Sequence, residues 1–542
     1  MKVFLFTLNA SYIHKSLALR CLKKSVENEG FETVCAEFTV KEKRLHVLER
    51  LSSEKADIYC FSCYIWNIDE MLSAAEKLKK LLPDSVIVFG GPEVSYESEE
   101  FFSSHEYVDF IVQGEGEETL PALCRDVMEN GRDMVKRKGR IIHSNPYADF
   151  AGEGILYSKD DVFASSVIYY ESSRGCPFSC SYCLSAAGHG IRSKSAQKVL
   201  EELLELEKLN DGIKIIKFVD RTFNFDKKRA YEIWRGLLSG KYTGKYHFEI
   251  CAELLDEEGF DLLSRFPVGK IQLEAGVQST NPKTLAAINR KSDTEKCIEN
   301  IRRIKEMGNI HIHADLIAGL PLEDINSFAG SFDDVYGSCH MLQLGFLKLL
   351  KGSPLYKEAD KYGIICSDHA PYEVLKTDAI SFEDLLRLHK ISDVLDRISN
   401  SGHFSYSLAG ILEKVDSPFG FFSSLSEYIG NVDLLSQLKL MELFHSFCIS
   451  LSAISKEEVN GRLRLDFYIH ETGSCPAFLS GGGELPVPPV YRGLAIRKAG
   501  AKIFAPAAEV HRFSFDPSGY YLIDRKNHFC ERWTEEEIIK LT

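Results

Sequence analysis

The run Arg174-Gly-Cys-Pro-Phe-Ser-Cys-Ser-Tyr-Cys183 carries more information than any other stretch of this sequence. Its cysteines, Cys176, Cys180 and Cys183, follow the spacing C-x3-C-x2-C. Three thiolates at this spacing can hold three irons of a [4Fe–4S] cluster and leave the fourth iron open to a substrate or a cofactor. The run therefore predicts a cluster with one open iron.

A zinc site is the alternative interpretation of these close cysteines. Zinc takes four ligands, usually as two separated pairs. The nearest further residue of a ligand type is His189, which lies in a Gly-His-Gly turn and not at zinc-finger spacing. The missing fourth ligand favours the iron–sulfur cluster.

The cysteine run, with the aromatic Tyr182 just before its last cysteine, resembles the signature of radical S-adenosylmethionine (SAM) enzymes. The resemblance implies that the open iron takes the amino and carboxylate groups of SAM. It also implies that one electron from the cluster splits SAM into methionine and a 5′-deoxyadenosyl radical. A one-electron donor of the flavodoxin or ferredoxin type is therefore an expected partner.

Composition sets further limits on the protein. The length of 542 residues suggests three or four domains, at roughly 150 residues each. The net charge of −14 argues against a protein that coats nucleic acid without specificity, although a local basic patch stays open. The 15 cysteines show no regular disulfide framework, and a cluster needs reduced thiols, so we expect a cytoplasmic protein.

Hydropathy predicts no membrane segment. The apolar start Met1–Leu8 stops at Asn9 and has no small-residue cleavage site, so it is interpreted as a buried first strand and not as a signal peptide. No stretch approaches the length of about 18 uninterrupted apolar residues that a membrane-spanning helix needs. We therefore expect no membrane partner.

Residues 1–125 alternate short apolar strands with helical stretches. Continuous apolar strands that alternate with helices predict an α/β fold with a parallel, doubly wound (Rossmann-like) sheet. In such sheets ligands bind beyond the carboxyl ends of the strands. The predicted strands are Val3–Leu8, Thr33–Phe38, Asp57–Ser62, Val86–Phe89 and Phe110–Val112.

The loops that follow these strands carry the candidate binding residues of this domain. Glycines among them let the backbone approach a bulky ligand closely. The candidates are Asn9, Tyr12, Ser62, Tyr64, Trp66, Gly90, Gly91, Pro92, Glu93, Gly114, Glu115 and Gly116.

These loops resemble the cobalamin (B12)-binding domain that precedes the radical SAM domain in many such enzymes. Ser62 precedes Gly90-Gly91 by a little under thirty residues, as a Ser-containing loop precedes a Gly-Gly pair in that fold. The Asp-x-His-x-x-Gly motif that supplies a histidine to cobalt is absent, because His14 follows Asn9 at the wrong spacing. The resemblance thus implies cobalamin bound without a protein histidine, with His14 as a polar residue at a helix start. The alternative is a flavodoxin-like domain that binds a nucleotide or nothing.

Residues 166–360 resemble the partial (β/α)6, TIM-like barrel of radical SAM proteins. Residues 126–165 are expected to form a linker, with the basic run Lys136–Arg140 in a solvated loop. The cysteine loop follows the first predicted barrel strand, as expected because chemistry in barrels sits on loops at the carboxyl ends of strands. The predicted strands are Val167–Tyr170, Ile213–Val219, His247–Cys251, Lys270–Glu274, His311–Ile317 and Leu342–Leu350.

By this resemblance, polar residues at the strand ends hold SAM. Asp220 would contact the methionine amino group, and Glu253 would face the ribose. Gln278 and Ser279 lie in the fourth-strand segment that approaches SAM, and Ala318-Gly-Leu-Pro321 matches the loop under the adenine. The alternative for each is a helix cap or a turn residue.

Two basic residues, Arg192 and Arg290, are candidates for the SAM carboxylate, and the alternative is that they form surface ion pairs. Radical chemistry of this kind needs no nucleophile or base from the polypeptide, since the cofactors do the chemistry and the protein positions them. We therefore predict no catalytic side chain.

Two stretches, Phe218–Asn224 and Glu274–Asn281, resemble one subfamily. It comprises cobalamin-binding radical SAM enzymes with a C-terminal domain of undefined function, and the resemblance covers nearly the whole chain. Residues 361–542 are expected to form an α+β domain that covers the barrel mouth or holds the substrate.

Periodicity gives the elements of this C-terminal domain. Residues 375–401 and 421–451 have helical spacing. Arg462–Ile469 and Lys502–Ile523 alternate like antiparallel strands, with Asp516-Pro-Ser-Gly519 as a turn.

Residues 490–530 are locally basic, with seven Lys or Arg against three Asp or Glu. Basic groups pair with phosphates and aromatic faces stack on unpaired bases, so one interpretation is an RNA-binding appendage with a tRNA nucleoside as the substrate. The alternative is a small antiparallel domain with the aromatic residues in its core. These aromatic residues are Tyr491, Phe504, Phe513, Phe515, Tyr520, Tyr521 and Phe529.

The combined resemblance implies a methyltransferase. One SAM methylates cobalamin, a second supplies the radical that removes hydrogen, and methylcobalamin gives its methyl group to an unactivated carbon or sulfur-bearing group. An alternative within the same cofactor class is cyclisation, rearrangement or C–S bond formation on a small molecule. A non-catalytic sensor that binds cobalamin and an iron–sulfur cluster is the alternative from a different class.

Overall fold

The computed structural model describes all residues except 97, 148–149, 151–153, 164–166, 187–189, 210–214, 500–502, 504–507 and 541–542. The chain divides into two compact units. The first comprises Met1–Asp324, Ser338–His340 and Gly345–Ser381, and the second comprises Ile325–Gly337, Met341–Leu344 and Phe382–Thr542. The domain boundaries expected from the sequence stay predictions.

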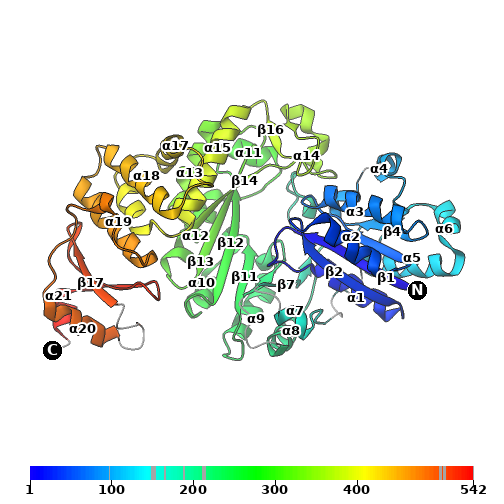
Figure 1. The fold of residues 1–542 in the computed structure, drawn as a ribbon, viewed down its shortest axis with the longest axis horizontal. Coiled ribbons are helices and arrows are strands. Elements are labelled where there is room, and N and C mark those ends of the chain that lie inside the picture. Colours follow the sequence, from blue (N-terminus) through cyan, green and yellow to red (C-terminus); the bar gives the residue numbers. More distant parts are fainter. Residues whose placement is uncertain are drawn as a thin grey trace. The chain divides into compact units, whose positions relative to one another are not determined.

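The first unit begins with a sheet of six parallel strands in the order β2-β1-β3-β4-β5-β6 (Figure 1). The order reverses between β1 and β3, and open α/β sheets bind ligands at the carboxyl ends of their strands near such a point. The five predicted strands are confirmed, and a sixth joins them from the residues predicted as linker. The strands are β1 (Lys2–Asn9), β2 (Glu32–Thr39), β3 (Ile58–Ser62), β4 (Val86–Gly90), β5 (Phe110–Gln113) and β6 (Ile141–His143).

Helices cover both faces of this sheet (Figure 1). Phe4 and Phe6 of β1 pack toward α2, α3 and α4, whereas Val3 and Leu5 pack toward α1, α5 and α6. Successive residues of a strand point to opposite faces, so a sheet buried on both faces requires continuous apolar strands. The helices are α1 (Leu17–Asn28), α2 (Arg44–Ser53), α3 (Ile68–Leu81), α4 (Ser98–Ser104), α5 (Gly116–Asn130) and α6 (Arg132–Lys138).

The prediction of a solvated loop for Lys136–Arg140 is wrong, because residues 136–138 form the last turn of α6. Lys136 makes an ion pair with Asp109, whose side chain is fully buried. Basic residues also favour the end of a helix, where the helix dipole is negative. The buried partner and the dipole together account for the helical form of this run.

A second six-stranded sheet, in the order β14-β13-β12-β11-β10-β7, confirms the predicted partial barrel. Strands β7, β10, β11, β12 and β13 run parallel. Along β12 every second residue is buried, so Glu274 and Gln278 lie on the face opposite to Leu273 and Val277. The strands are β7 (Val167–Tyr170), β10 (Ile215–Phe218), β11 (Lys245–Ile250), β12 (Ile271–Gln278), β13 (His311–Ala318) and β14 (Met341–Phe346).

Three helices of the barrel, α9, α10 and α12, begin at aspartate caps. The side chains of Asp226, Asp256 and Asp293 each accept a hydrogen bond from the backbone N–H three residues on, which satisfies a donor that the helix leaves free. The barrel helices are α8 (Ala196–Leu209), α9 (Lys227–Leu237), α10 (Glu257–Ser264), α11 (Pro282–Ala287) and α12 (Thr294–Glu306). The smaller elements of this unit are α7 (Lys159–Phe163), α14 (Pro354–Lys357), β8 (Ser173–Arg174), β9 (Arg192–Ser193), β15 (Ile365–Cys366) and β16 (Val374–Lys376).

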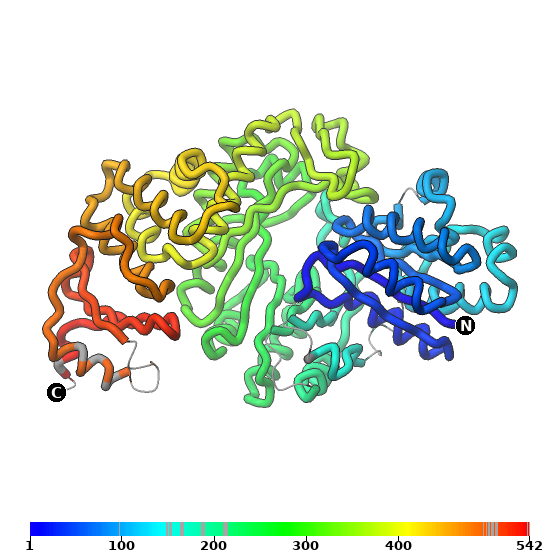
Figure 2. Tube along the Cα trace, in the orientation of Figure 1, coloured from blue at the N-terminus to red at the C-terminus, as the bar shows by residue number. Residues whose placement is uncertain are grey.

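The second unit combines helices with a three-stranded antiparallel sheet, as the predicted α+β class requires, and Figure 2 follows the chain through it. The helices predicted around residues 375–401 and 421–451 are confirmed. The helices are α13 (Ile325–Tyr336), α15 (Phe382–Val394), α16 (Ser405–Leu412), α17 (Pro418–Ile429), α18 (Gln437–Ser450), α19 (Lys456–His470), α20 (Pro489–Ala499) and α21 (Glu535–Ile539). The strands are β17 (Ala508–Phe513), β18 (Asp516–Asp524) and β19 (Phe529–Thr534). Within the described parts of the chain, no helix has the length and apolar character needed to cross a membrane.

Two predictions for this unit are wrong. Arg462–Ile469 belongs to helix α19 and not to a strand. This helix buries polar residues too: Asp466 is fully buried and accepts a hydrogen bond from the Ser407 hydroxyl. A helix buried on several sides loses its 3.6-residue pattern, which explains the false alternation. The predicted turn at Asp516–Gly519 lies inside β18, because the hairpin turns at Ser514 and Phe515.

Candidate functional site

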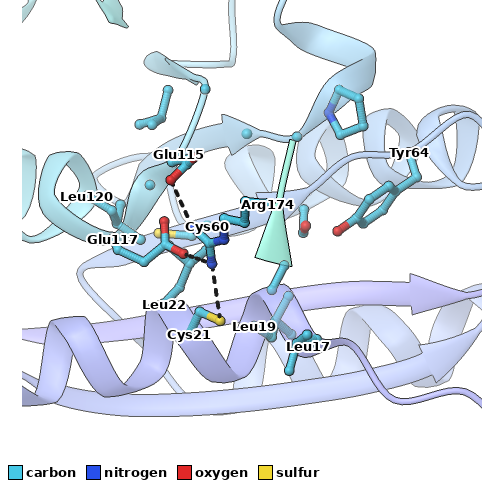
Figure 3. A pocket seen from close by; sticks show the side chains of 18 of the residues that line it. Leu17, Leu19, Cys21, Leu22, Cys60, Tyr64, Glu115, Glu117, Leu120 and Arg174 are labelled. Atoms are coloured by element: carbon cyan, nitrogen blue, oxygen red, sulfur yellow. Dashed lines mark hydrogen bonds and ion pairs between the residues drawn. The ribbon is translucent and has the colours of Figure 1, made fainter. Parts of the chain in front are cut away.

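A cavity of about 470 Å³ lies at the carboxyl ends of β3, β4 and β5 (Figure 3). This edge of an α/β sheet is where ligands bind. Eight of the predicted loop residues line it, namely Ser62, Tyr64, Gly90, Gly91, Pro92, Gly114, Glu115 and Gly116. We call this hollow the first cavity.

The first cavity continues between the sheet and helices α1 and α5, where its walls are apolar. Ligand pockets are commonly lined by apolar side chains with a few polar groups that fix orientation. Sequence reasoning missed these residues, because an apolar residue has the same pattern whether it packs in a core or lines a hollow. They are Leu5, Leu17, Leu19, Cys21, Leu22, Cys60, Val88, Val112 and Leu120.

Three glycines shape the polar rim of the first cavity. Gly91 has a φ of +105°, and a Cβ atom there would lie 2.4 Å from the carbonyl oxygen of Cys63. Gly114 has a φ of +90°, and a Cβ atom on Gly116 would lie 2.8 Å from a methyl group of Leu22. Only glycine adopts such positive φ angles readily. These glycines are therefore consistent with loops whose backbone comes close to a large ligand.

Asn9 and Tyr12 do not line the first cavity. The Asn9 amide donates to Glu37 at 2.8 Å and to the carbonyl of His14 at 3.1 Å, and Tyr12 is 81% exposed. His14 hydrogen-bonds the hydroxyl of Tyr169 through Nδ1 at 2.5 Å. Among the described residues, no histidine lines this cavity. That cobalamin binds without a protein histidine on its cobalt stays a prediction.

Trp66 and Glu93 also lie outside the first cavity and hold its loops. Trp66 donates from Nε1 to the carbonyl of Leu8 at 3.1 Å, and its ring stacks on Tyr64 with centroids 4.5 Å apart. Glu93 accepts a hydrogen bond from the hydroxyl of Tyr372, and burial raises its pKa above the ordinary value. Trp66 and Glu93 therefore support the loops around the first cavity and do not line it.

The barrel supplies a charged wall to the first cavity. Arg174 donates to Glu115 at 2.8 Å, to Glu117 at 2.7 Å and to Glu171 at 2.9 Å, and Figure 3 shows its guanidinium between Glu115, Glu117 and Cys21. Burial raises the pKa of Glu171 to about 7, even though Arg174 opposes this shift. The wall thus carries one carboxyl group that titrates near neutral pH.

A second cavity of about 310 Å³ lies at the mouth of the barrel and is lined by Cys176, Cys180 and Cys183. Cys180 is 6% exposed, and its sulfur lies 3.8 Å from Nη1 of Arg290. Burial raises the pKa of the Cys180 thiol, and Arg290 works against that rise. Three thiols that face one cavity fit a cluster with an open iron. In the described part of the chain, no group of three or more His, Cys, Asp or Glu is arranged to hold a single metal ion.

Three carboxylates also line the second cavity: Glu249, Glu274 and Asp315. A hydrogen bond from His247 at 2.9 Å and the charge of Lys217 outweigh burial and lower the pKa of Glu274 to about 2. Burial and the neighbouring carboxylates raise the pKa of Asp315 to about 7. Sequence reasoning missed these residues because all three lie inside strands, including Glu274, at which the predicted fourth strand ends too early.

Of the residues expected at SAM, Gln278 and Arg290 line the second cavity. Gln278 has a φ of +73°, a strained conformation for a residue with a side chain. Nη2 of Arg290 donates to the carbonyl of Gly276 at 2.5 Å. These two side chains are the predicted residues that the fold brings to the cysteines.

Asp220 and Ser279 do not line either cavity. Asp220 is fully buried and accepts hydrogen bonds from the backbone N–H of Ser172 at 3.0 Å, from its hydroxyl at 2.6 Å, and from the hydroxyl of Ser173. Ser279 donates to Glu323 at 2.7 Å. Asp220 therefore fixes the chain just before the cysteine loop.

Three other expected SAM positions also lie outside the second cavity. Glu253 accepts a hydrogen bond from Ser292 at 2.9 Å. Arg192 pairs with Glu115 of the first cavity. The carbonyl of Ala318 in the segment 318–321 accepts a backbone hydrogen bond from residue 347 at 2.9 Å. These contacts match the alternative interpretation, in which the residues form caps, turns or ion pairs.

The two cavities adjoin. Ser185, which follows the last motif cysteine, and Arg221, which follows β10, line both of them. The glycine-rimmed hollow of the N-terminal sheet and the cysteine-lined hollow of the barrel thus share a wall. A ligand bound in one cavity would therefore lie next to a ligand bound in the other.

Three of the aromatic side chains of residues 490–530 are buried in the C-terminal domain. Phe513, Tyr520 and Tyr521 are 0%, 2% and 3% exposed. Arg512 donates to a carbonyl of β18 at 2.8 Å, and Phe504 lies outside the described residues. The core interpretation is therefore right for these three aromatic residues, whose faces cannot stack on bases.

Three segments of the chain match known families. Residues 5–124 match the B12 binding domain, residues 170–335 the Radical SAM superfamily, and residues 360–484 the "Protein of unknown function (DUF4080)". The chain is similar to the cobalamin-dependent radical SAM methyltransferase TokK of Streptomyces tokunonensis, with 25% identity over 343 residues that cover 57% of this chain and 49% of that protein. The chain spans about half the length of the curated relatives it matches.

Two further similarities come from a tRNA-modifying protein and from a solved structure. The tRNA-2-methylthio-N(6)-dimethylallyladenosine synthase of Rickettsia akari is 25% identical over 319 residues, covering 53% of this chain and 68% of that protein. The radical SAM methyltransferase TsrM from Kitasatospora setae, solved with cobalamin and a [4Fe–4S] cluster, has a TM-score of 0.59 at 16% identity, covering 79% of this chain and 98% of that chain. At this identity the structural likeness shows the fold.

The fold, the two adjoining cavities and the family matches define the class of this chain by its domains: it carries an N-terminal B12 binding domain and a Radical SAM domain. Residues 360–484, which match DUF4080, follow these two domains. The cofactors of this class are a [4Fe–4S] cluster, SAM and cobalamin.

Proposed function

We propose that this protein is a cobalamin-dependent radical SAM methyltransferase. The shared wall of the two cavities, at Ser185 and Arg221, is the observation that carries the proposal. A bound and reduced cluster would supply the electron that splits SAM into methionine and a 5′-deoxyadenosyl radical, and bound cobalamin would supply the methyl group. Adjoining cavities let the radical and the methyl group meet one substrate, which a pair of separate sites would not allow.

Residues of this chain would hold each cofactor in its cavity. The three motif cysteines would hold the cluster, and their loop is fixed through Asp220. The glycines at positions 90, 91, 114 and 116 would admit cobalamin to the rim of the first cavity, whose apolar depth excludes water. Gln278 and Arg290 would orient SAM beside Cys180. The protein thus positions reactive groups and supplies no nucleophile.

We extend the proposal to the surroundings of the enzyme. A one-electron donor of the flavodoxin or ferredoxin type would reduce the cluster, and the cytoplasm would keep the motif thiols reduced. Methyl transfer would go to an unactivated carbon or to a sulfur-bearing group of the substrate.

For the substrate, we propose a tRNA nucleoside as the first to be tested. The similarity to a tRNA-modifying synthase over 53% of this chain supports it. Gel shifts with bulk tRNA at low salt test the idea, since RNA affinity falls steeply with salt. Absence of binding at low salt would remove tRNA and leave a small-molecule substrate.

The central experiment uses anaerobically reconstituted protein that carries cobalamin. SAM and a one-electron reductant are added, and 5′-deoxyadenosine and S-adenosylhomocysteine are followed by mass spectrometry. Both products support the methyltransferase. Deoxyadenosine alone contradicts methyl transfer and favours cyclisation, rearrangement or C–S bond formation. Neither product, in protein with an intact cluster, favours a non-catalytic sensor.

A further inference from the structure

The two ends of the cysteine loop are held together by a short ladder. Strands β8 and β9 pair antiparallel, with Ser173 opposite Ser193 and Arg174 opposite Arg192. Gly175, the next residue, has a φ of +96°, and a Cβ atom there would lie 2.5 Å from the carbonyl oxygen of residue 190. The backbone is therefore tightly packed just before Cys176, and the position of the ladder sets the position of the loop.

Both arginines of this ladder converge on Glu115, which lies between β5 and α5 on the rim of the first cavity. Nη1 of Arg174 donates to Glu115 Oε2 at 2.8 Å, and Nη1 of Arg192 donates to the same oxygen at 2.9 Å. Nη2 of Arg192 donates to Oε1, and the backbone N–H of Tyr147 donates to Oε2 at 2.8 Å. Burial alone would raise the pKa of Glu115, but hydrogen bonds from Arg192, Tyr147 and Arg174 outweigh it and lower the pKa.

Every nitrogen of the Arg174 guanidinium also donates to a carboxylate. Its Nε donates to Glu171 and its Nη2 donates to Glu117, while its guanidinium lies 4.7 Å from the ring centre of Phe150. The side chain is only 12% exposed. Arginine holds a fixed, planar set of donors, so an arginine with every nitrogen bound to carboxylates has a single position. Removal of one carboxylate would release part of that constraint.

We propose that Glu115 is a positioning residue that fixes the cysteine loop against the first cavity through Arg174 and Arg192. This inference rests on the proposed function for the identity of the two cofactors. It changes the role expected for Glu115, from a contact with cobalamin to an anchor of the cluster. A carboxylate offers about four acceptor sites, and Glu115 already accepts four hydrogen bonds within the protein.

The test compares reconstituted full-length Glu115→Gln, Arg192→Lys and Glu118→Gln proteins. Glu118 is the neighbour of Glu117 on α5 and serves as the matched control. Three quantities are measured: the affinity for hydroxocobalamin, the EPR spectrum of the reduced cluster with and without SAM, and kcat and KM for deoxyadenosine formation. None of them needs methyl transfer, so failure of the proposed function and failure of this inference are distinguishable.

We expect Glu115→Gln and Arg192→Lys to keep the cobalamin affinity and the iron content of the wild type. Their EPR spectra should change, and kcat should fall roughly 10- to 100-fold at unchanged KM for SAM, as small misplacements of reacting groups do. The double variant Glu115→Gln/Arg192→Lys should be no worse than either single one, because the two side chains act through each other. Glu118→Gln should match the wild type.

Two results would overturn the inference. One is a loss of cobalamin affinity in Glu115→Gln with an unchanged EPR spectrum, which would make Glu115 a direct cobalamin contact. The other is additive loss in the double variant, which would make the two side chains independent. If Glu115→Gln folds poorly, Arg192→Lys keeps the charge and carries the same test.

Discussion

Cys180 is the buried member of the cysteine triad, and Arg290 lies against its sulfur. Replacement of Cys180 by alanine would remove one of the three proposed cluster ligands, so we expect iron and acid-labile sulfide to fall to near background in the reconstituted protein. Cys366→Ser is the matched control, because Cys366 is a half-buried free cysteine outside both cavities. Equal iron content in the two variants would exclude Cys180 as a ligand.

Gly91 combines a positive φ with a close approach to the backbone of residue 63. We expect Gly91→Ala to lower the free energy of unfolding by about 1–3 kcal/mol and to weaken cobalamin binding. Gly330→Ala is the control, since a Cβ atom on that helical glycine would meet open space and alanine favours helices. Denaturant unfolding and absorbance titration measure both effects. Unchanged cobalamin affinity in Gly91→Ala would contradict the claim that the loop at Gly91 shapes the cobalamin site.

Asp315 makes stability depend on pH through its raised pKa of about 7. Because this folded-state pKa lies above the ordinary value of 3.8, the folded state binds more protons between about pH 4 and 7, and stability falls as pH rises through that window. We expect Asp315→Asn to be more stable than wild type at about pH 8, by on the order of a few kcal/mol, and to differ less at about pH 4. Urea unfolding at both pH values measures this, and an equal difference at both would contradict it.

At the scale of elements, buried ion pairs fix helices to the N-terminal sheet. Helix α6 is held by Lys136, which pairs with the buried Asp109, and helix α3 reaches the same carboxylate through Lys79 at 2.9 Å. Asp109 also accepts a hydrogen bond from the backbone N–H of Ile87 at 2.8 Å. One carboxylate before β5 thus orients two helices on opposite faces of the sheet.

Two lysines of α6 allow a matched test of this anchor. We expect Lys136→Met to cost about 1–3 kcal/mol, because it removes an ion-pair partner from a buried carboxylate. Lys138 is 60% exposed and pairs with Asp126, so Lys138→Met should cost about 0–1 kcal/mol. Chemical denaturation of both variants measures the two losses of unfolding free energy. Equal losses would show that the buried ion pair stabilises the fold no more than the exposed one.

At the scale of the whole molecule, both proposed cofactor sites belong to the first unit. A ligand stabilises the part of the chain that binds it, by about 2.7 kcal/mol at a hundredfold excess over Kd. We expect calorimetry to show two unfolding transitions, of which hydroxocobalamin raises only one. If both transitions moved equally, the two units would unfold together.

The sequence by itself determined the elements and the class of this protein. Local rules govern these features: apolar strands that alternate with helices require a parallel sheet, and the spacing of Cys176, Cys180 and Cys183 fits three ligands of a cluster. Sequence periodicity also fails to predict an element when burial on several sides hides the helical pattern. Helix α19 has the alternation of a strand because its polar residues, such as Asp466, are buried beside its apolar ones.

Only the tertiary structure decided which side chains face each cavity. Asp220 and Asp315 are both aspartates on barrel strands or just after them. Asp220 accepts hydrogen bonds from Ser172 and Ser173, whereas Asp315 lines the same cavity as the three motif cysteines. Glu115 has the position of a binding residue in its loop and instead joins two arginines that lie 59 and 77 residues further along the chain. Such partners are set by long-range packing, because the free energy of a buried charge depends on groups that no local pattern contains.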